Sequence, residues 1–313
     1  MKGKCTAVAA CVLLLLLCAC QGKSAGQDVN IPADPVEEFP DVTATAPEAA
    51  PTPTVTTAPD PTPPGESSPE PSPEPTPELT PTPVPTAAPE PSSSAVSPDQ
   101  LEAYFEDTVF IGDSIMEGIR QYVAKNRPKE PTLGSAQFLT STIGVSVADL
   151  LEGEKEGPFY RYNGKSQPLL QILSQMECRR IFLQLGLNDM AAANPVVEKS
   201  IEQYAQLVDL LQSAVPGAEI IIITNPPKVA STWLPSYTPN RSFGNKLIAE
   251  YVDALVRMCD DRGIPCLDAH TALLDANGAL PDNYCRDGFV HLNDAGSKVV
   301  VEELYRFAAE RIG

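Results

Sequence analysis

Residues 99–313 alternate between short apolar runs and longer stretches with a helical period. Five apolar runs end in turn residues and predict strands: Thr108 to Gly112, Phe138 to Gly144, Arg180 to Gly186, Glu219 to Asn225 and Ile264 to Ala269. Within the fourth run, Ile220 to Ile223 are all β-branched, which is typical of a strand covered on both faces.

Two further stretches place apolar residues three and four positions apart and predict helices that pack on a core. One runs from Leu247 to Cys259, and the other runs from Val299 to Ile312 with Asn293 as a predicted N-cap. Strands alternating with helices predict an α/β fold: a three-layer αβα domain around a doubly wound sheet of about five parallel strands. Such a sheet binds ligands at the carboxyl ends of its strands.

The amino terminus has the pattern of a secretion signal. Two lysines precede a short apolar run that ends at Leu17-Cys18-Ala19-Cys20, and this run is shorter than the roughly 20 apolar residues of a spanning helix. The segment resembles the bacterial lipoprotein box, which implies removal of residues 1–19 and acylation of Cys20. The alternative is cleavage after Ala19 that releases a soluble secreted protein. The expected location is the extracytoplasmic face of a bacterial cell membrane.

Residues 20–98 are predicted to be an extended tether. Of the 33 prolines in the chain, 21 lie in residues 21–98, mostly in Thr-Pro, Glu-Pro and Ser-Pro units. Such units favour polyproline II and cannot form a packed core. The folded domain is therefore expected in residues 99–313.

Charge and cysteine spacing narrow the partners of this domain. Residues 99–313 carry 29 acidic and 19 basic side chains, so the basic surface that nucleic acid or anionic lipid requires is missing, and membrane contact is expected through the lipid anchor only. The chain has two histidines and no C-x-x-C pair, which argues against a zinc site, and nothing implies a cofactor. The spacing of Cys178, Cys259, Cys266 and Cys285 leaves disulfides and free thiols both open.

Polar clusters follow the predicted strands, where a doubly wound sheet would carry its site. They are Gly112-Asp113-Ser114, Gly144, Gly186-Leu187-Asn188-Asp189 and Asn225-Pro226-Pro227, with Asp287-Gly288-Phe289-Val290-His291 before the last helix. A serine hydroxyl needs a base, and His270 and His291 are the only histidines. His291 is preferred because Asp287 precedes it by four residues and can orient the imidazole ring, whereas His270 is interpreted as a polar loop residue.

In order along the chain, Phe110 to Ser114, Leu185 to Asp189 and the Asp287 to His291 segment resemble the blocks of the SGNH (GDSL-type) hydrolase family. The resemblance covers residues 104–312 and implies the flavodoxin-like fold of that family, with Ser114 as nucleophile, His291 as base and Asp287 as its partner. It also implies an oxyanion hole formed by the Ser114 amide, an amide near Gly144 and the Asn188 side chain. We interpret Asp113 and Asp189 as structural residues that hold turns through backbone hydrogen bonds.

Two positions depart from the family pattern. The final block usually spaces aspartate and histidine three residues apart, whereas Asp287 and His291 are four apart. The family has a further block, here called the second block, between the one that ends at Ser114 and the one that contains Asn188. Many relatives carry G-x-S-G there, whereas this chain has Gly144-Val145-Ser146-Val147, which ends in valine. The role of Asp287 and the identity of the donating amide in the second block are therefore the points that a structure must decide.

The substrate is expected to be a short acyl ester, most simply O-acetyl, on a cell-wall or other carbohydrate. Trp233, Tyr237 and Arg241 follow the fourth strand, where aromatic rings can stack on a sugar or merely pack locally in a surface loop. The same site in an O-acyltransferase would pass the acyl group to a sugar hydroxyl instead of water. A glycan-binding lipoprotein without catalysis is the alternative outside enzymes.

Overall fold

The computed structural model describes residues 96–155 and 157–313. The predicted signal peptide, Cys20 and residues 20–95 of the predicted tether lie outside the described residues. Within the described ranges, no helix combines the length and the apolar character that a membrane crossing demands.

Five parallel strands form the central sheet, as predicted. Their order is β2-β1-β5-β6-β7, which is the 2-1-3-4-5 order of flavodoxin-like folds. The strands are β1 (Thr108–Gly112), β2 (Gln137–Thr140), β5 (Arg180–Gln184), β6 (Glu219–Ile223) and β7 (Cys266–Leu267). The sheet order reverses beside β1, so the carboxyl ends of β1 and its neighbours border the crevice where such folds bind ligands.

The central strands are buried on both faces because successive side chains point to opposite layers. Val109 and Ile111 of β1 face one core cluster, while Phe110 faces the other. The parallel register sets Phe110 beside Phe138 and Phe182, and its ring stacks on each of them with ring centroids 4.8 Å apart. This phenylalanine ladder ties β2, β1 and β5 together on one face.

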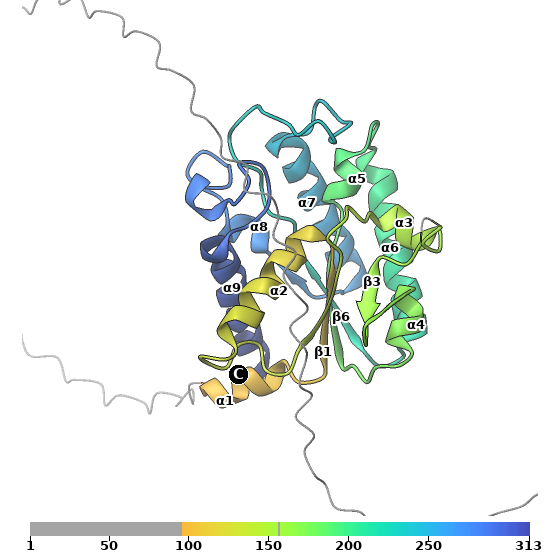
Figure 1. Cartoon of the computed structure of the whole chain (residues 1–313), viewed down its shortest axis with the longest axis vertical. Helices are drawn as coiled ribbons and strands as arrows, with labels where there is room; N and C mark the ends of the chain where they lie inside the picture. Colours follow the sequence, from red (N-terminus) through yellow and green to blue (C-terminus); the bar gives the residue numbers. More distant parts are fainter. Residues whose placement is uncertain (1–95, 156) are drawn as a thin grey trace, which may run out of the picture. The chain divides into compact units, whose positions relative to one another are not determined.

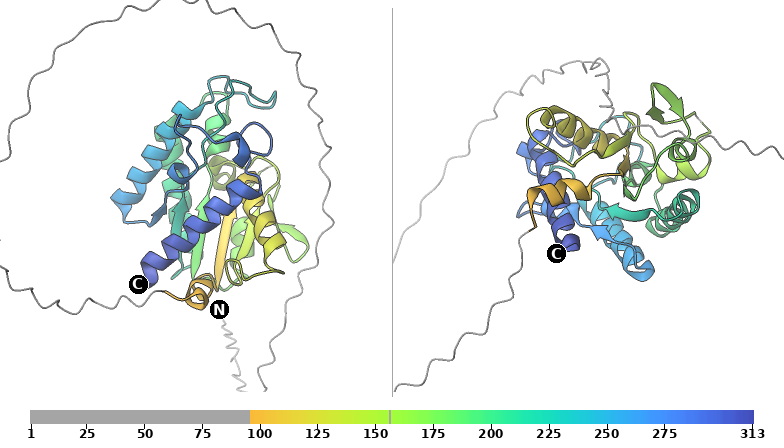
Figure 2. Two further views of the ribbon diagram at one scale, coloured as in Figure 1. Left: turned by 90° about the vertical axis from the view of Figure 1, so that its left-hand side faces the viewer. Right: turned by 90° about the horizontal axis from the view of Figure 1, so that it is seen from below.

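Helices cover both faces of the sheet (Figures 1 and 2). Helices α1, α2 and α9 pack on the face that carries the phenylalanine ladder, and α3, α4, α6 and α7 pack on the other. The bounds are α1 (Pro98–Tyr104), α2 (Ser114–Asn126), α3 (Val147–Leu151), α4 (Leu169–Leu173), α5 (Leu187–Ala191), α6 (Val197–Ala214), α7 (Asn245–Arg262), α8 (Ala269–Ala272), the 3₁₀ turn η1 (Asp282–Tyr284) and α9 (Asp294–Ile312). The predicted helices correspond to α7 and α9, and Asn293 caps α9 by accepting bonds from the Ala295 and Gly296 amides.

Several strands are shorter than the sequence predicts. Strand β2 ends at Thr140 rather than Gly144, because the chain leaves the sheet at Ser141, whose hydroxyl bonds the Ile143 amide. Strand β7 ends at Leu267, and Ala269 already begins α8. A small antiparallel hairpin, β3 (Tyr160–Tyr162) with β4 (Lys165–Gln167), was not predicted.

The four cysteines of the domain are free thiols in this structure. Cys259 lies in the last turn of α7, and Gly263 reverses the chain so that Cys266 returns beside it in β7. The proximity of the two thiols lowers the pKa of Cys259 and raises the pKa of Cys266. Of the two alternatives that the sequence left open, the structure shows free thiols.

The chain enters the domain far from the carboxyl ends of the strands. Helix α1 precedes the amino end of β1, and Val96 lies against the carboxyl-terminal Gly313. Figure 1 shows α1 and the carboxyl terminus at one end of the sheet and the loop before α7 at the other. The residues after the strands therefore face away from the point where the preceding segment joins the domain.

Candidate active site

Three of the predicted site residues lie within hydrogen-bond distance of one another. Ser114 is the first residue of α2, directly after β1, and its Oγ lies 2.9 Å from His291 Nε2. On the other side of the ring, His291 Nδ1 lies 2.5 Å from Asp287 Oδ2. A hydroxyl, an imidazole and a carboxylate in this sequence form the arrangement of a serine nucleophile with its base and orienting acid.

The loop from Asp287 to His291 folds around the Asp287 carboxylate. Its Oδ1 accepts hydrogen bonds from the Phe289 amide at 2.9 Å, the His291 amide at 3.2 Å and the Cys285 thiol at 3.4 Å. The Arg286 amide donates to the His291 carbonyl at 2.8 Å, which closes the loop. The additional residue between aspartate and histidine is therefore accommodated by a turn that leaves Oδ2 directed at the imidazole.

This environment keeps Asp287 ionised. Burial opposes the charge, but the hydrogen bond and the charge of His291, with the Phe289 amide, outweigh it and hold the pKa of Asp287 well below its usual range. An ionised carboxylate at Oδ2 accepts the Nδ1 proton and leaves Nε2 free to accept a proton from Ser114.

In the folded domain, the Asn188 side chain lies between Asp113 at the end of β1 and Val145 after β2. Its Nδ2 donates to Asp113 Oδ2 at 2.9 Å and to the Val145 carbonyl at 3.0 Å. Both amide hydrogens therefore have partners, and an oxyanion would have to replace one of them. Asn188 also explains the glycine of the second block, because a Cβ on Gly144 would lie 2.9 Å from Asn188 Oδ1.

Two backbone amides at the site are available to a ligand. Among the described residues, no hydrogen-bond partner is found for the N–H of Ser114 or of Gly144. Ser114 opens α2, where the first-turn amides have no partner within the helix and favour negative charge. These two amides remain the predicted oxyanion donors, together with the Asn188 side chain.

Gly186 of the third block has two structural reasons to be glycine. Its φ is +118°, which disfavours any side chain, and a Cβ there would clash with the hydroxyl oxygen and ring of Tyr251. Tyr251 projects from α7, so the turn that presents Asn188 packs directly against a buried tyrosine.

Asp113 and Asp189 both accept structural hydrogen bonds from backbone amides, as predicted. Asp113 caps α2 by accepting from the Ile115 amide at 2.9 Å. Asp189 accepts from the Val147 and Ala148 amides at the start of α3, at 3.0 and 3.4 Å, and so connects its turn to a helix distant in sequence. Burial raises the pKa of each carboxyl to about 6, against these hydrogen bonds.

The Ser114 hydroxyl opens into a cleft of about 700 Å³. The apolar part of its lining includes Leu187, Phe243, Phe289 and Val290, and its polar part includes Thr142, Asn194, Lys199, Gln203 and Thr238. Asn188, Gly144 and His291 line it as well. The four blocks that contain Ser114, Gly144, Asn188 and His291 therefore meet at this cleft.

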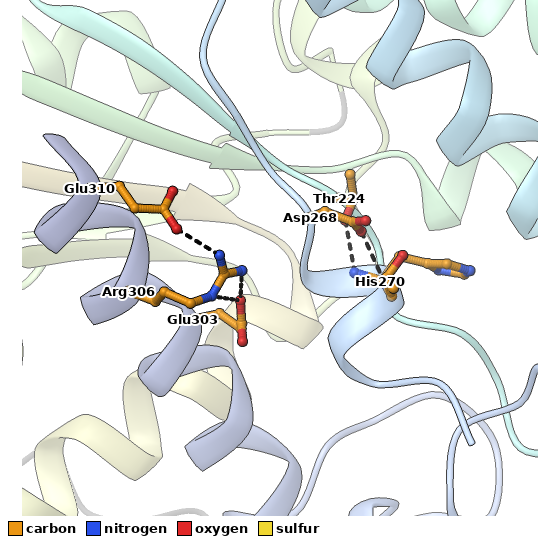
Figure 3. A network of polar contacts seen from close by, with 7 residues as sticks. Thr224, Asp268, His270, Glu303, Arg306 and Glu310 are labelled. Carbon is orange, nitrogen blue, oxygen red and sulfur yellow. Dashed lines mark hydrogen bonds and ion pairs between the residues drawn. The ribbon is translucent and has the colours of Figure 1, made fainter. Parts of the chain in front are cut away.

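The second histidine has a different environment from the one expected of a polar loop residue. His270 lies in α8 and is 7% exposed, with Nδ1 2.8 Å from the Asn225 carbonyl. Figure 3 shows it beside Thr224, whose hydroxyl accepts from the His270 amide, and Asp268; the same view shows Arg306 of α9 with its glutamate partners. His270 is not among the described residues that line the cleft.

The three residues singled out after the fourth strand have different roles. Tyr237 lines the cleft. Trp233 packs edge-on against Phe289, with centroids 6.3 Å apart. Arg241 donates to the Pro235 and Thr238 carbonyls, which places it inside the loop rather than in the cleft.

The sequence analysis missed Lys228, a buried lysine that organises the same loop. It is 4% exposed, and its ammonium group donates to the carbonyls of Val229 and Ser231. Asn245 bonds both the amide and the carbonyl of Lys228, each at 2.8 Å. No feature of the sequence around Lys228 predicts that its side chain is buried, so only the structure identifies this role.

Within the described ranges, no cluster of three or more histidine, cysteine, aspartate or glutamate side chains is arranged to hold a metal ion. The chemistry that the geometry presents is that of the serine, imidazole and carboxylate.

The chain is similar to several known proteins. Similar solved structures include a GDSL-like lipase from Bacteroides thetaiotaomicron (17% identity, 66% of this chain and 88% of that chain, TM-score 0.47) and a lipase/acylhydrolase from Enterococcus faecalis (16%, 65% and 96%, 0.44). Another is an acetylxylan esterase from Geobacillus stearothermophilus, in a catalytic mutant form (16%, 64% and 93%, 0.43). No protein of curated function matches the chain. The sequence profile of the GDSL-like lipase/acylhydrolase family matches residues 110–299, more than half of the chain, and the protein therefore belongs to that family.

Proposed function

We propose that this protein is an extracytoplasmic serine esterase that removes short acyl groups, most simply acetyl, from esters on cell-wall or other carbohydrate. The observation that carries the proposal is the continuous hydrogen-bonded relay from Asp287 Oδ2 through His291 to Ser114 Oγ, at the edge of an open cleft. Membership of a lipase and acylhydrolase family supports ester chemistry on an acylated substrate.

In the first step, Ser114 Oγ attacks the ester carbonyl carbon while His291 Nε2 takes the hydroxyl proton. The amides of Ser114 and Gly144 stabilise the oxyanion, with Asn188 exchanging one of its present acceptors for it. The carbon–oxygen bond to the alcohol breaks, the alcohol leaves with the proton from His291, and an acyl group remains on Ser114. In the second step, His291 deprotonates water, which attacks the acyl group, and Ser114 recovers its proton as the acid leaves.

Acetate release tests this proposal. We expect the protein to release p-nitrophenol from p-nitrophenyl acetate and acetate from an O-acetylated oligosaccharide, with p-nitrophenyl palmitate turned over far less efficiently. Release from neither acetyl ester would refute it. Accumulation of a newly acetylated sugar instead of free acetate, when an acceptor oligosaccharide is added, would show a transferase.

We also propose that the protein is anchored to the outer face of the cell membrane through an acylated Cys20. The basic and apolar start of the chain and the Ala19-Cys20 junction support acylation at Cys20, and residues 21–98 then act as the tether. An anchor of this kind holds the domain at the membrane when more than one acyl chain is attached. Metabolic labelling with a fatty acid should label the expressed full chain and not Cys20→Ser; equal labelling of both would exclude Cys20.

A further inference from the structure

We propose that the cleft binds a neutral glycan chain across its mouth, with Trp233 and Tyr237 as a stacking platform for sugar rings. The inference rests on the proposed esterase function and specifies the substrate it acts on: an uncharged oligosaccharide or polysaccharide rather than a small ester, an anionic polymer or a lipid.

The exposed large hydrophobic side chains of the domain are concentrated at one place. Among the described residues, four such side chains are exposed: Ile143 (60%), Val196 (53%), Trp233 (55%) and Tyr237 (70%). We call these four the cleft rim. Val196 and Tyr237 line the cleft, Ile143 lies between the lining residues Thr142 and Gly144, and Trp233 contacts the lining residue Phe289.

The cleft rim is assembled from three separate connections of the fold. Ile143 follows β2, Val196 precedes α6, and the two aromatic residues lie between β6 and α7. Exposed apolar side chains scattered singly need no explanation, but their collection around one opening marks a binding surface. The shared position of the four side chains therefore points to a ligand that extends beyond the ester itself.

The cleft interior favours a sugar over an alkyl chain. Beside its apolar residues the cleft is lined by amide and hydroxyl groups, among them the half-buried Gln203 and the buried Thr238, and a fatty acyl chain lying on these two groups would leave them without hydrogen-bond partners. A sugar offers hydroxyl groups to them and an apolar C–H face to an aromatic ring. The polar lining and the aromatic residues of the rim together match this mixed surface.

Charge favours a neutral chain. Lys199 is accompanied in the cleft lining by the carboxylates of Asp149 and Glu152, and the domain as a whole has more acidic than basic side chains. An anionic polymer or an anionic lipid surface would meet repulsion at this opening.

The loop that carries the two rings is held in place before any ligand binds. At one end, the Lys228 ammonium bonds two carbonyls and Asn245 bonds the Lys228 backbone. At the other end, Arg241 bonds the Pro235 and Thr238 carbonyls. A platform that is already ordered loses less conformational freedom on binding, so its rings contribute more of their contact energy to affinity.

Trp233 is the only tryptophan of the chain, so its fluorescence reports binding at the platform without catalysis. We expect xylohexaose and chitohexaose to shift the emission of the full-length Ser114→Ala variant in a saturable manner. Tyr237→Ala in that background should weaken the affinity about 3- to 10-fold, because it removes one of the two rings. Tyr237→Phe, which keeps the ring, should retain most of the affinity.

Polygalacturonate and phosphatidylcholine vesicles are the matched alternatives. A saturable shift with either of them and none with the neutral hexasaccharides would overturn the inference, as would equal affinity of Tyr237→Ala and the parent. Binding is measured in the Ser114→Ala variant and hydrolysis in the unmodified protein, so the two results are independent. A missing shift in Ser114→Ala, when the unmodified protein hydrolyses p-nitrophenyl acetate, refutes the platform alone. A shift in Ser114→Ala, when the unmodified protein shows no hydrolysis, supports the platform and refutes the esterase.

Discussion

The Ser114→Ala and His291→Ala variants are each expected to lose about 10³- to 10⁶-fold in kcat on p-nitrophenyl acetate, and the double variant is expected to lose no more than either single one. The reason is the hydrogen bond between Ser114 Oγ and His291 Nε2, at 2.9 Å. Nucleophile and base act in one step, so removing either abolishes the same transition-state interaction. Steady-state kinetics of the three variants measure this directly.

His270 provides a matched control. It is the only other histidine of the chain and lies in α8, outside the cleft lining. His270→Gln should keep kcat within a few-fold of the parent, although it loses a buried hydrogen bond to the Asn225 carbonyl. The assignment would be contradicted if the loss of kcat in the double variant equalled the product of the losses in the Ser114 and His291 single variants. It would also be contradicted if His270→Gln were as inactive as His291→Ala.

The Asp287→Asn variant is expected to lower kcat by about 10³- to 10⁴-fold, with little change in the temperature of unfolding. Asparagine can still accept the Phe289 and His291 amides through its carbonyl oxygen, as Asp287 Oδ1 does. Its NH₂ group then faces His291 Nδ1 and donates to it. The imidazole is forced to carry its proton on Nε2, where it can no longer accept the proton of Ser114.

Asp268→Asn is the control for this variant. Like Asp287, Asp268 precedes a histidine by a few residues, but it follows β7 and caps α8 by accepting from the Thr271 amide at 3.0 Å. We expect this change to affect thermal stability and to leave kcat within a few-fold. A kcat near the parent value in Asp287→Asn would mean that another group orients His291.

The role of Asp287 illustrates what spacing can and cannot decide. The four-residue separation from His291 departs from the usual pattern of the family, so spacing alone does not assign Asp287 as the partner of the imidazole. The structure accommodates it because Oδ1 accepts two amides and a thiol from its own loop, which leaves Oδ2 free for the imidazole. Hydrogen bonds within a turn depend on backbone angles that the number of residues does not specify.

The oxyanion hole shows a similar limit. The sequence predicts donors at the Ser114 amide, near Gly144 and at the Asn188 side chain, and in the structure a Cβ on Gly144 would lie 2.9 Å from Asn188 Oδ1. The sequence does not show which of these donors is free to bind an oxyanion. In the structure the Asn188 amide already donates to Asp113 and to the Val145 carbonyl. Which donors are free depends on contacts between residues more than 40 positions apart in the chain.

The sequence by itself determined the parallel αβα fold, the family and the residues that meet as serine, histidine and aspartate. These follow from local apolar runs of period two and 3.6 and from short blocks that each lie at the end of one strand, so neighbouring residues carry the information. Only the tertiary structure decided the burial of Lys228 and His270, the bond from Asp189 to α3, and the gathering of Ile143, Val196, Trp233 and Tyr237 around the cleft. Exposure is set by which distant segments pack against a side chain, and that is a property of the assembled fold.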